Sequence, residues 1–266
     1  MGLRVVACQL DIAWEDRAES HRRAAALLEQ ARPPQGSLVI LPEMFSTGFS
    51  VNVDATAEGT ERASERFLAD TARRLGACML GGVVTRERPG ALAMNQAVAF
   101  GPDGSERVRY AKIHPFSFAG EDRRFTRGRE VVTFPWGGFT VAPFVCYDLR
   151  FPEVFRVAAL RGATVLVVIA NWPAPREAHW LALLTARAIE NQAYVVGANR
   201  CGRDPHAAYS GRSRIVDPRG RVVAEAGDTE TTIEADLDPE VVQAYRREFP
   251  VLADVDPRFV PGLPPR

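Results

Sequence analysis

The sequence contains almost no lysine, although it carries many basic residues. Of its 33 lysine and arginine residues, 32 are arginine and only one, Lys112, is lysine. Arginine keeps its proton and presents a planar fork, whereas lysine offers a compact ammonium whose pKa responds to its surroundings. The single lysine therefore indicates either chance or a role that arginine cannot fill, and composition alone leaves both open.

The chain also lacks net charge and long apolar runs. Its 33 basic and 33 acidic residues balance, so its bulk electrostatics give no reason to expect binding to nucleic acid or to an anionic membrane. No run approaches the roughly 18 apolar residues of a membrane span, and the start, MGLRVVACQL, lacks the pattern of a signal peptide. We expect a cytoplasmic protein with no nucleic-acid or membrane partner, which leaves a small neutral or anionic molecule as its ligand.

Cysteine and histidine are scarce and scattered. The four cysteines lie far apart without a CxxC pair, which argues against a zinc site and against a disulfide framework. The four histidines lack the short spacing of a zinc motif, and neither GxGxxG nor GxxxxGK[ST] occurs. We therefore expect reduced thiols, no metal and no cofactor.

Apolar strand patterns alternate with amphipathic helix patterns, which predicts an α/β layered fold with a large mixed sheet or two packed sheets. A chain of 266 residues with 46% hydrophobic content can bury a large core. We expect one domain over residues 1–266, ending in an extended tail from about residue 257. The expected helices cover 17–31, 63–75, 152–160, 178–191 and a short segment after 238, and the expected strands cover 3–9, 37–41, 78–84, 95–100, 107–110, 131–134, 139–145, 164–169, 194–198, 211–216, 221–224 and 232–236.

Three chemically capable residues stand at the ends of expected strands. Glu43 follows LVILP, Lys112 follows VRYA, and Cys146 follows VAPFV. Strand ends are where α/β sheets place ligands and chemistry. A cysteine is a good nucleophile only as a thiolate, so it needs a base and a positive or hydrogen-bonding environment. Glu43 can serve as that base and Lys112 as that charge.

Each of these residues also has a structural interpretation. Cys146 alone fits a buried core thiol, and Glu43 alone fits an acid in the first turn of a helix, but neither explanation accounts for all three residues together. His114, two residues after Lys112, offers a rival cysteine–histidine pair, although a structural hydrogen bond is the commoner role for such a histidine.

The segments LPEMFSTGF, YAKIHPF and FVCYDLRFPE resemble the three signature segments of the nitrilase superfamily, the carbon–nitrogen hydrolases, in residue type, order and spacing. The similarity continues through AGEDRRFTRG, ANWPAPREAHW, ARAIENQAYVVGANRCG and YSGRSRIVDPRG, so it covers roughly residues 3–236. LPEMFSTGF and NWPAPR look most like the omega-amidase branch of that superfamily. The resemblance implies a four-layer αββα sandwich that forms a homodimer through its helical layer.

The resemblance also implies roles for individual residues. Glu43 is expected to be the general base, Lys112 to stabilise the oxyanion, and Cys146 to be the nucleophile. The backbone N–H of Tyr147 is expected to be the second oxyanion donor. Glu121 in FAGEDRRF stands where the family often has a second glutamate lining the site.

The activity implied is hydrolysis of a small-molecule amide through a cysteine acyl-enzyme, on 2-oxo acid amides such as 2-oxoglutaramate and 2-oxosuccinamate. The carboxylate of such a substrate needs a cationic or donor-rich end pocket, for which Arg176 is the candidate, with Trp172 and Phe116 as walls. We interpret Asp148 and Arg150 as support for the turn after the nucleophile.

Other activities remain open at this point. The same three residues would serve a nitrilase, an N-carbamoyl amino acid hydrolase or an amidase for aliphatic amides. A member without catalytic activity that binds a metabolite or a partner is the alternative from a different class.

Overall fold

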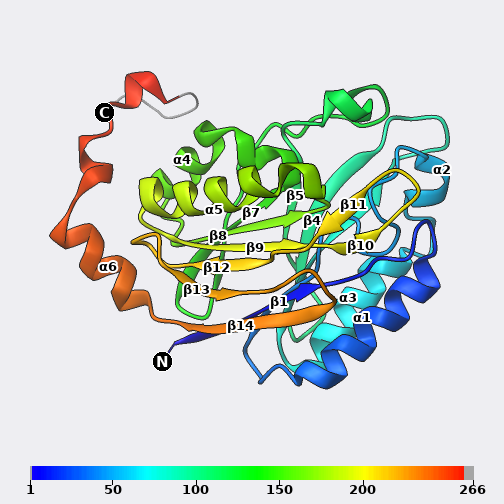
Figure 1. Ribbon diagram of the computed structural model, residues 1–266, viewed down its shortest axis with the longest axis horizontal. Coiled ribbons are helices and arrows are strands. Elements are labelled where there is room, and N and C mark those ends of the chain that lie inside the picture. Colours follow the sequence, from blue (N-terminus) through cyan, green and yellow to red (C-terminus); the bar gives the residue numbers. More distant parts are fainter. Residues whose placement is uncertain (1, 261–266) are drawn as a thin grey trace.

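Two six-stranded sheets pack face to face in the computed structural model, which describes residues 2–260 (Figure 1). Three parallel strands form the middle of each sheet, and antiparallel strands flank them. The first sheet runs in the order β14 (Thr231–Leu237), β1 (Leu3–Gln9), β2 (Leu38–Ile40), β3 (Cys78–Thr85), β4 (Met94–Phe100) and β5 (Glu106–Ala111). The second runs in the order β13 (Val222–Glu225), β12 (Arg214–Val216), β9 (Tyr194–Asn199), β8 (Val165–Ala170), β7 (Phe139–Val145) and β6 (Phe134–Trp136).

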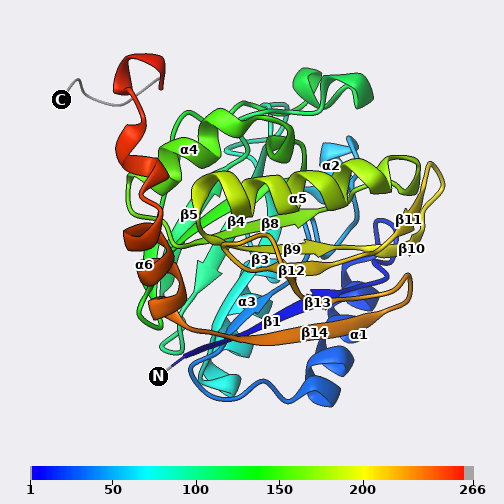
Figure 2. The ribbon, with the colours of Figure 1, turned by 60° about the vertical axis from the view of Figure 1, so that its left-hand side comes forward.

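Helices cover the outer face of each sheet. α1 (Arg17–Ala31) and α3 (Ala63–Leu75) lie against the first sheet, and α4 (Pro152–Leu160) and α5 (Glu177–Asn191) lie against the second (Figures 1 and 2). These four layers confirm the expected αββα sandwich. The helices α2 (Val53–Thr56) and α6 (Pro239–Glu248) and the hairpin β10 (Cys201–Arg203) and β11 (Ala208–Ser210) lie outside the layers. No helix among the described residues is both long and apolar enough to span a bilayer.

In the first sheet, alternating side chains of the inner strands belong to two different cores. Along β1, Val5 and Ala7 belong to the core between the sheets, whereas Val6 and Cys8 belong to the core beneath α1 and α3. Successive side chains of a strand point to opposite faces, so a strand buried on both faces must be apolar throughout. This is why the middle strands read as continuous apolar runs in the sequence.

Local signals set the helix ends. The Asp16 side chain accepts a hydrogen bond from the Glu19 N–H at 3.0 Å and so caps α1. Asp238 caps α6 in the same way, and α4 begins at Pro152, where a missing N–H is harmless. Gly76 ends α3 with a φ of 61°, a conformation that glycine adopts without strain.

Most expected elements are confirmed, with small differences at their ends, and the exceptions are one edge strand, some short elements that were not expected, and the start of the tail. The expected strand at 131–134 is wrong, because the turn at Gly137 and Gly138 pairs Trp136 with Phe139 and so places the edge strand at Phe134–Trp136. Neither α2 nor the hairpin β10–β11 was expected. The expected extended tail begins instead with a short 3₁₀ helix, Pro257–Phe259, and its residues 261–266 lie outside the described part of the chain.

β3 passes unusually close to the turn that follows β2. The Gly82 N–H donates to the Pro42 carbonyl at 3.1 Å, and the Gly82 carbonyl accepts from the Phe45 N–H at 3.2 Å. A Cβ at position 82 would lie 2.5 Å from the Glu43 Cα. The turn carrying Glu43 therefore depends on a glycine in the neighbouring strand.

We predict that Gly82→Ala lowers the free energy of unfolding by about 1–3 kcal/mol, because the added methyl group forces two backbone segments apart. Urea unfolding measures this directly. Gly59→Ala is the matched control, since a Cβ there meets no heavy atom within 4 Å. Equal stability of the two variants would contradict the steric account.

Candidate active site

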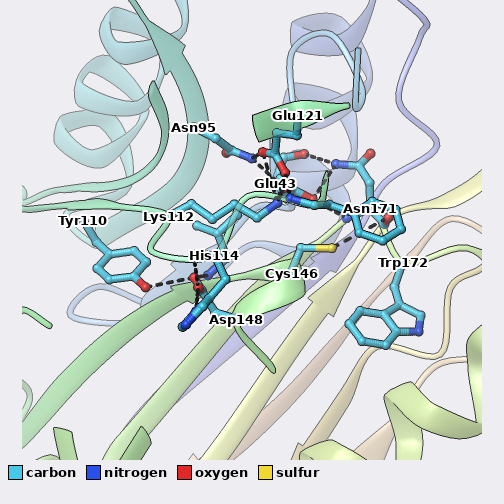
Figure 3. A network of polar contacts seen from close by, with 12 residues as sticks. Glu43, Asn95, Tyr110, Lys112, His114, Glu121, Cys146, Asp148, Asn171 and Trp172 are labelled. Atoms are coloured by element: carbon cyan, nitrogen blue, oxygen red, sulfur yellow. Dashed lines mark hydrogen bonds and ion pairs between the residues drawn. The ribbon is translucent and has the colours of Figure 1, made fainter. Parts of the chain in front are cut away.

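Glu43, Lys112 and Cys146, the three candidate residues at strand ends, lie close together although they come from two different sheets (Figure 3). Glu43 follows β2 and Lys112 follows β5 in the first sheet, whereas Cys146 follows β7 in the second. The Lys112 Nζ donates to Glu43 Oε1 at 3.1 Å and to Glu121 Oε2 at 2.8 Å. Glu43, Glu121 and Lys112 are all buried. The centre of the site is therefore one ammonium held between two carboxylates away from water.

Two asparagines that the sequence analysis missed complete this cluster. Asn95, in β4, donates through Nδ2 to Glu43 Oε1 at 2.7 Å and to Glu121 Oε1 at 2.9 Å. Asn171, directly after β8, donates through its backbone N–H to Glu43 Oε2 at 2.9 Å and through Nδ2 to the Glu43 carbonyl at 2.6 Å. Asn171 stands at a strand end and could have been found by that criterion, whereas Asn95 lies within a strand and gives no such signal.

Burial and pairing act in opposite directions on the charges of the cluster. Burial alone would raise the pKa of the Glu43 carboxyl, but Lys112 and the hydrogen bonds from Asn95 and Asn171 outweigh it and hold this pKa below its ordinary value. Burial would likewise lower the pKa of Lys112, and the carboxylates of Glu121 and Glu43 raise it instead. The Glu43 carboxyl and the Lys112 ammonium are thus both charged in the resting site.

The thiol of Cys146 is held in its neutral form. Burial raises its pKa well above the ordinary value, the Glu43 carboxylate raises it further, and Lys112 only partly offsets them. Cys146 Sγ lies 3.9 Å from the Asn171 carbonyl oxygen. A neutral thiol of this kind can act as a nucleophile only if a nearby base takes its proton.

The backbone at Cys146 is strained. Its φ of 46° lies in the left-handed region, which costs a non-glycine residue about 1–2 kcal/mol. Cys146 begins the 3₁₀ helix Cys146–Arg150 immediately after β7, so the chain turns sharply at the thiol. Strain of this kind concentrates at functional sites, where the surrounding structure imposes it.

Asp148 joins the end of β5 to the turn after β7. Its carboxylate accepts from the Tyr110 hydroxyl at 2.8 Å, from the His114 N–H at 2.9 Å and from His114 Nδ1 at 2.8 Å. Tyr110 and His114 flank Lys112 in the sequence, and Asp148 lies two residues after Cys146. This buried carboxylate therefore fixes the lysine relative to the cysteine across the two sheets, which is the supporting role expected for it.

His114 has structural contacts. Besides its bonds to Asp148, its ring stacks on Phe151 with 3.8 Å between the ring centroids. The side chain is thus engaged on two sides, and these contacts match the structural hydrogen bond considered for it rather than a base paired with the thiol.

A pocket opens beside Cys146 and contains the residues expected to bind substrate. Phe116, Trp172 and Arg176 line it together with Tyr147. Tyr209, from the hairpin β10–β11, also lines this pocket and was not expected there. The expected substrate-binding residues therefore share one cavity with the cysteine and the lysine.

Arg150, which was expected to support the turn after Cys146, also lines the pocket. Its guanidinium carbon lies 4.7 Å from the centroid of the Trp172 ring, and that of Arg176 lies 5.6 Å from the centroid of the Phe116 ring. In the described chain these two arginines contact rings and, for Arg150, His179 Nδ1 at 3.3 Å, rather than a carboxylate. Burial lowers the pKa of Arg150, and the charge of Arg176 adds to this effect. The pocket is thus lined by two cations that form no ion pair with a carboxylate in the described part of the chain.

Within residues 2–260, no three histidine, cysteine, aspartate or glutamate side chains are grouped as a metal site would require. The four cysteines, all in the described part of the chain, form no disulfide.

Comparison with known proteins identifies relatives over almost the whole chain. Residues 4–247 match the family model described as carbon-nitrogen hydrolase. The omega-amidase YafV of Yersinia enterocolitica is 38% identical over 96% of this chain and 97% of the relative, and the 2-oxoglutaramate amidase of Bacillus subtilis is 34% identical over 93% and 95%. The crystal structure of XC1258 from Xanthomonas campestris, a CN-hydrolase superfamily protein with an arsenic adduct in its active site, superposes with a TM-score of 0.89 at 34% identity, covering 96% of this chain and 98% of that one.

We predict that Glu43→Gln makes Cys146 react faster with iodoacetamide near pH 8. The substitution removes a negative charge that raises the pKa of the thiol, so the thiolate fraction at a fixed pH increases. Peptide mass spectrometry of the alkylated native protein measures the rate at each cysteine.

The other cysteines are internal controls for this measurement. Cys8, Cys78 and Cys201 are buried, with pKa values raised by burial to about 12, and are expected to stay unlabelled in both proteins. Slower alkylation of Cys146 in the variant would show that Glu43 does not act on the thiol through its charge.

Proposed function

Since this chain belongs to the carbon–nitrogen hydrolase family, we propose that it hydrolyses the terminal amide of small 2-oxo acids through a thioester on Cys146. As a family member it is a hydrolase of carbon–nitrogen bonds other than peptide bonds. The observation that carries the proposal is that one pocket contains both a thiol near an ionised glutamate and two arginines that pair with no carboxylate of residues 2–260.

Acylation begins with the transfer of the Cys146 proton to Glu43 as Sγ attacks the amide carbon. The carbonyl π bond becomes an oxyanion, which Lys112 Nζ and the Tyr147 N–H stabilise. Tyr147 stands in the first turn of a helix, where N–H groups have no intrahelical partner. Each preorganised donor of this kind contributes about 3 kcal/mol in enzymes where it has been removed.

Collapse of the tetrahedral intermediate breaks the carbon–nitrogen bond. The proton held by Glu43 passes to the nitrogen, ammonia leaves, and the acyl group remains on Sγ as a thioester. Water then gives a proton to Glu43 while its oxygen attacks the thioester carbon. The carbon–sulfur bond breaks, the proton returns to the sulfur, and the 2-oxo acid is released. One carboxylate thus serves both half-reactions, and Glu121 holds Lys112 through both of its oxygens.

The two arginines of the pocket favour an amide substrate that carries a carboxylate at its other end. A 2-oxo acid amide carries a carboxylate opposite the amide, and guanidinium groups bind carboxylates with charge-assisted hydrogen bonds. Arg150 and Arg176 supply two such groups, and Phe116 and Trp172 supply flat apolar walls beside them. A neutral aliphatic amide or a nitrile would leave both cations without a partner.

We predict that the purified protein releases ammonia from 2-oxoglutaramate and 2-oxosuccinamate at least tenfold faster than from glutamine, an aliphatic amide or a nitrile. Cys146→Ala removes the nucleophile and is expected to abolish turnover while leaving the fold intact. An ammonia assay over this panel tests both points. Turnover of another substrate instead would place the protein in a different branch of the family, and silence on every substrate would favour a binding role.

We predict that Arg176→Gln and Arg150→Gln each raise KM for 2-oxoglutaramate by roughly tenfold to one hundredfold with less change in kcat. The estimate follows from about 1.5–3 kcal/mol for a hydrogen bond to a charged group. Steady-state kinetics provide the measurement, and Arg74→Gln, on the exposed side of α3, controls for the loss of one positive charge. An unchanged KM in both pocket variants would exclude this carboxylate site.

A further inference from the structure

Asn95 devotes its whole donor capacity to the two catalytic carboxylates. An amide nitrogen carries two N–H groups, and Nδ2 of Asn95 contacts Glu43 Oε1 at 2.7 Å and Glu121 Oε1 at 2.9 Å. Asn95 lies between the glutamates, on the strand next to the one that ends at Lys112 (Figure 3). It is therefore the neutral counterpart of the lysine, because both residues bond to the same two carboxylates.

The rest of the Asn95 side chain gives no reason for an asparagine here. Its Oδ1 is buried and has no hydrogen-bond partner within the described chain, and a buried acceptor without a donor destabilises a fold. An apolar residue of similar shape would avoid this loss. The advantage of an asparagine at position 95 therefore lies in the two hydrogen bonds that its N–H groups donate.

The charge balance of the cluster explains that need. Two buried carboxylates face one ammonium, so one negative charge is left without a counter-ion. Like charges at close range raise the pKa of one member of a carboxylate pair. The polarised N–H groups of a neutral amide oppose this effect without adding a charge.

We propose that Asn95 is a positioning residue that keeps Glu43 ionised beside the Glu121 carboxyl, so that Glu43 is ready to take the proton of the Cys146 thiol. The proposal rests on the function proposed above, because it assigns Asn95 to the ionisation of the general base. Burial raises the pKa of Glu43, and the hydrogen bond from Asn95 is, after the charge of Lys112, the largest of the contacts that hold this pKa below its ordinary value. Loss of Asn95 therefore leaves a glutamate that is more often protonated in weak acid and cannot act as a base.

The test is the pH dependence of kcat for Asn95→Leu, which keeps the shape and removes both donors. In the unmodified protein we expect kcat to be nearly flat from pH 8 down to pH 5. In the variant we expect it to fall about tenfold over this range, with KM unchanged, which corresponds to a rise of about two units in the pKa of Glu43, because a group that is mostly ionised at pH 5 must become mostly protonated there. A structural role alone would lower activity equally at every pH.

Asn191→Leu is the matched control. Asn191 is likewise buried, donates through Nδ2 and has an Oδ1 without a partner in the described chain, but it lies on α5 and bonds to Arg187. It is expected to change stability without changing the pH profile. If Asn95→Leu does not fold, Asn95→Ser retains one hydroxyl donor and is expected to show a smaller fall, of about threefold. A flat profile, or a loss independent of pH, in the folded variant overturns the proposal.

The assay uses whichever amide the unmodified protein hydrolyses, so a different substrate leaves the test of Asn95 intact. If no amide is hydrolysed, NMR titration of ¹³C-carboxyl-labelled glutamate reads the ionisation directly, with Glu43 and Glu121 assigned from Glu43→Gln and Glu121→Gln. An upward shift of one of these titrations in Asn95→Leu supports the proposal even then, and unchanged titrations overturn it.

Discussion

The site depends on a single buried contact, that of the Lys112 ammonium with the carboxylates of Glu43 and Glu121. Removing charges from water costs several kcal/mol per ion unless close partners compensate, so none of the three could be buried alone. The ammonium has three N–H groups on one atom and reaches Glu43 Oε1 and both oxygens of Glu121 from one point. The planar fork of an arginine cannot converge in this way. This geometry explains why a protein that otherwise uses arginine in place of lysine has a lysine at position 112.

The contact also determines how the thiol is activated. Many reactive cysteines rely on a lowered pKa, but here burial and the neighbouring Glu43 carboxylate raise the pKa of Cys146. In the proposed mechanism the Cys146 thiol is therefore neutral until its proton moves, and Glu43 must be ionised and correctly placed beforehand. That requirement explains the density of donors around Glu43 from β4, β5 and the end of β8. The Asp148 carboxylate also contributes, by accepting hydrogen bonds from Tyr110 and His114. These bonds hold Lys112 of the first sheet close to Cys146 of the second.

The sequence predicts the layers and the charged centre because both follow from local pattern. Apolar runs that end in Glu43, Lys112 and Cys146 identify strands and their ends, and two sheets facing each other bring those ends together. The contribution of Asn95 could not be predicted, because its role depends on which residues lie next to it in the fold. Its contacts with Glu43 and Glu121 come from segments outside its own strand. In the sequence, Arg150 looks like part of the start of a helix. Its position in the pocket follows from the path of the 3₁₀ helix Cys146–Arg150, which the sequence did not predict. The edge strand at Phe134–Trp136 depends on its turn rather than on the two valines before it.

In the proposed function, the placement of the arginines connects substrate specificity to catalysis. An amide is neutral, so nothing in the bond to be broken requires a cation at the far end of the pocket. Arg150 and Arg176 are close enough for their charges to oppose each other, and an anion placed between them would relieve that repulsion. Arg150 stands four residues after Cys146 in the same 3₁₀ helix. A carboxylate bound there would pull on the segment that carries the nucleophile and the Tyr147 N–H, so binding at one end of the substrate would fix the reacting groups at the other.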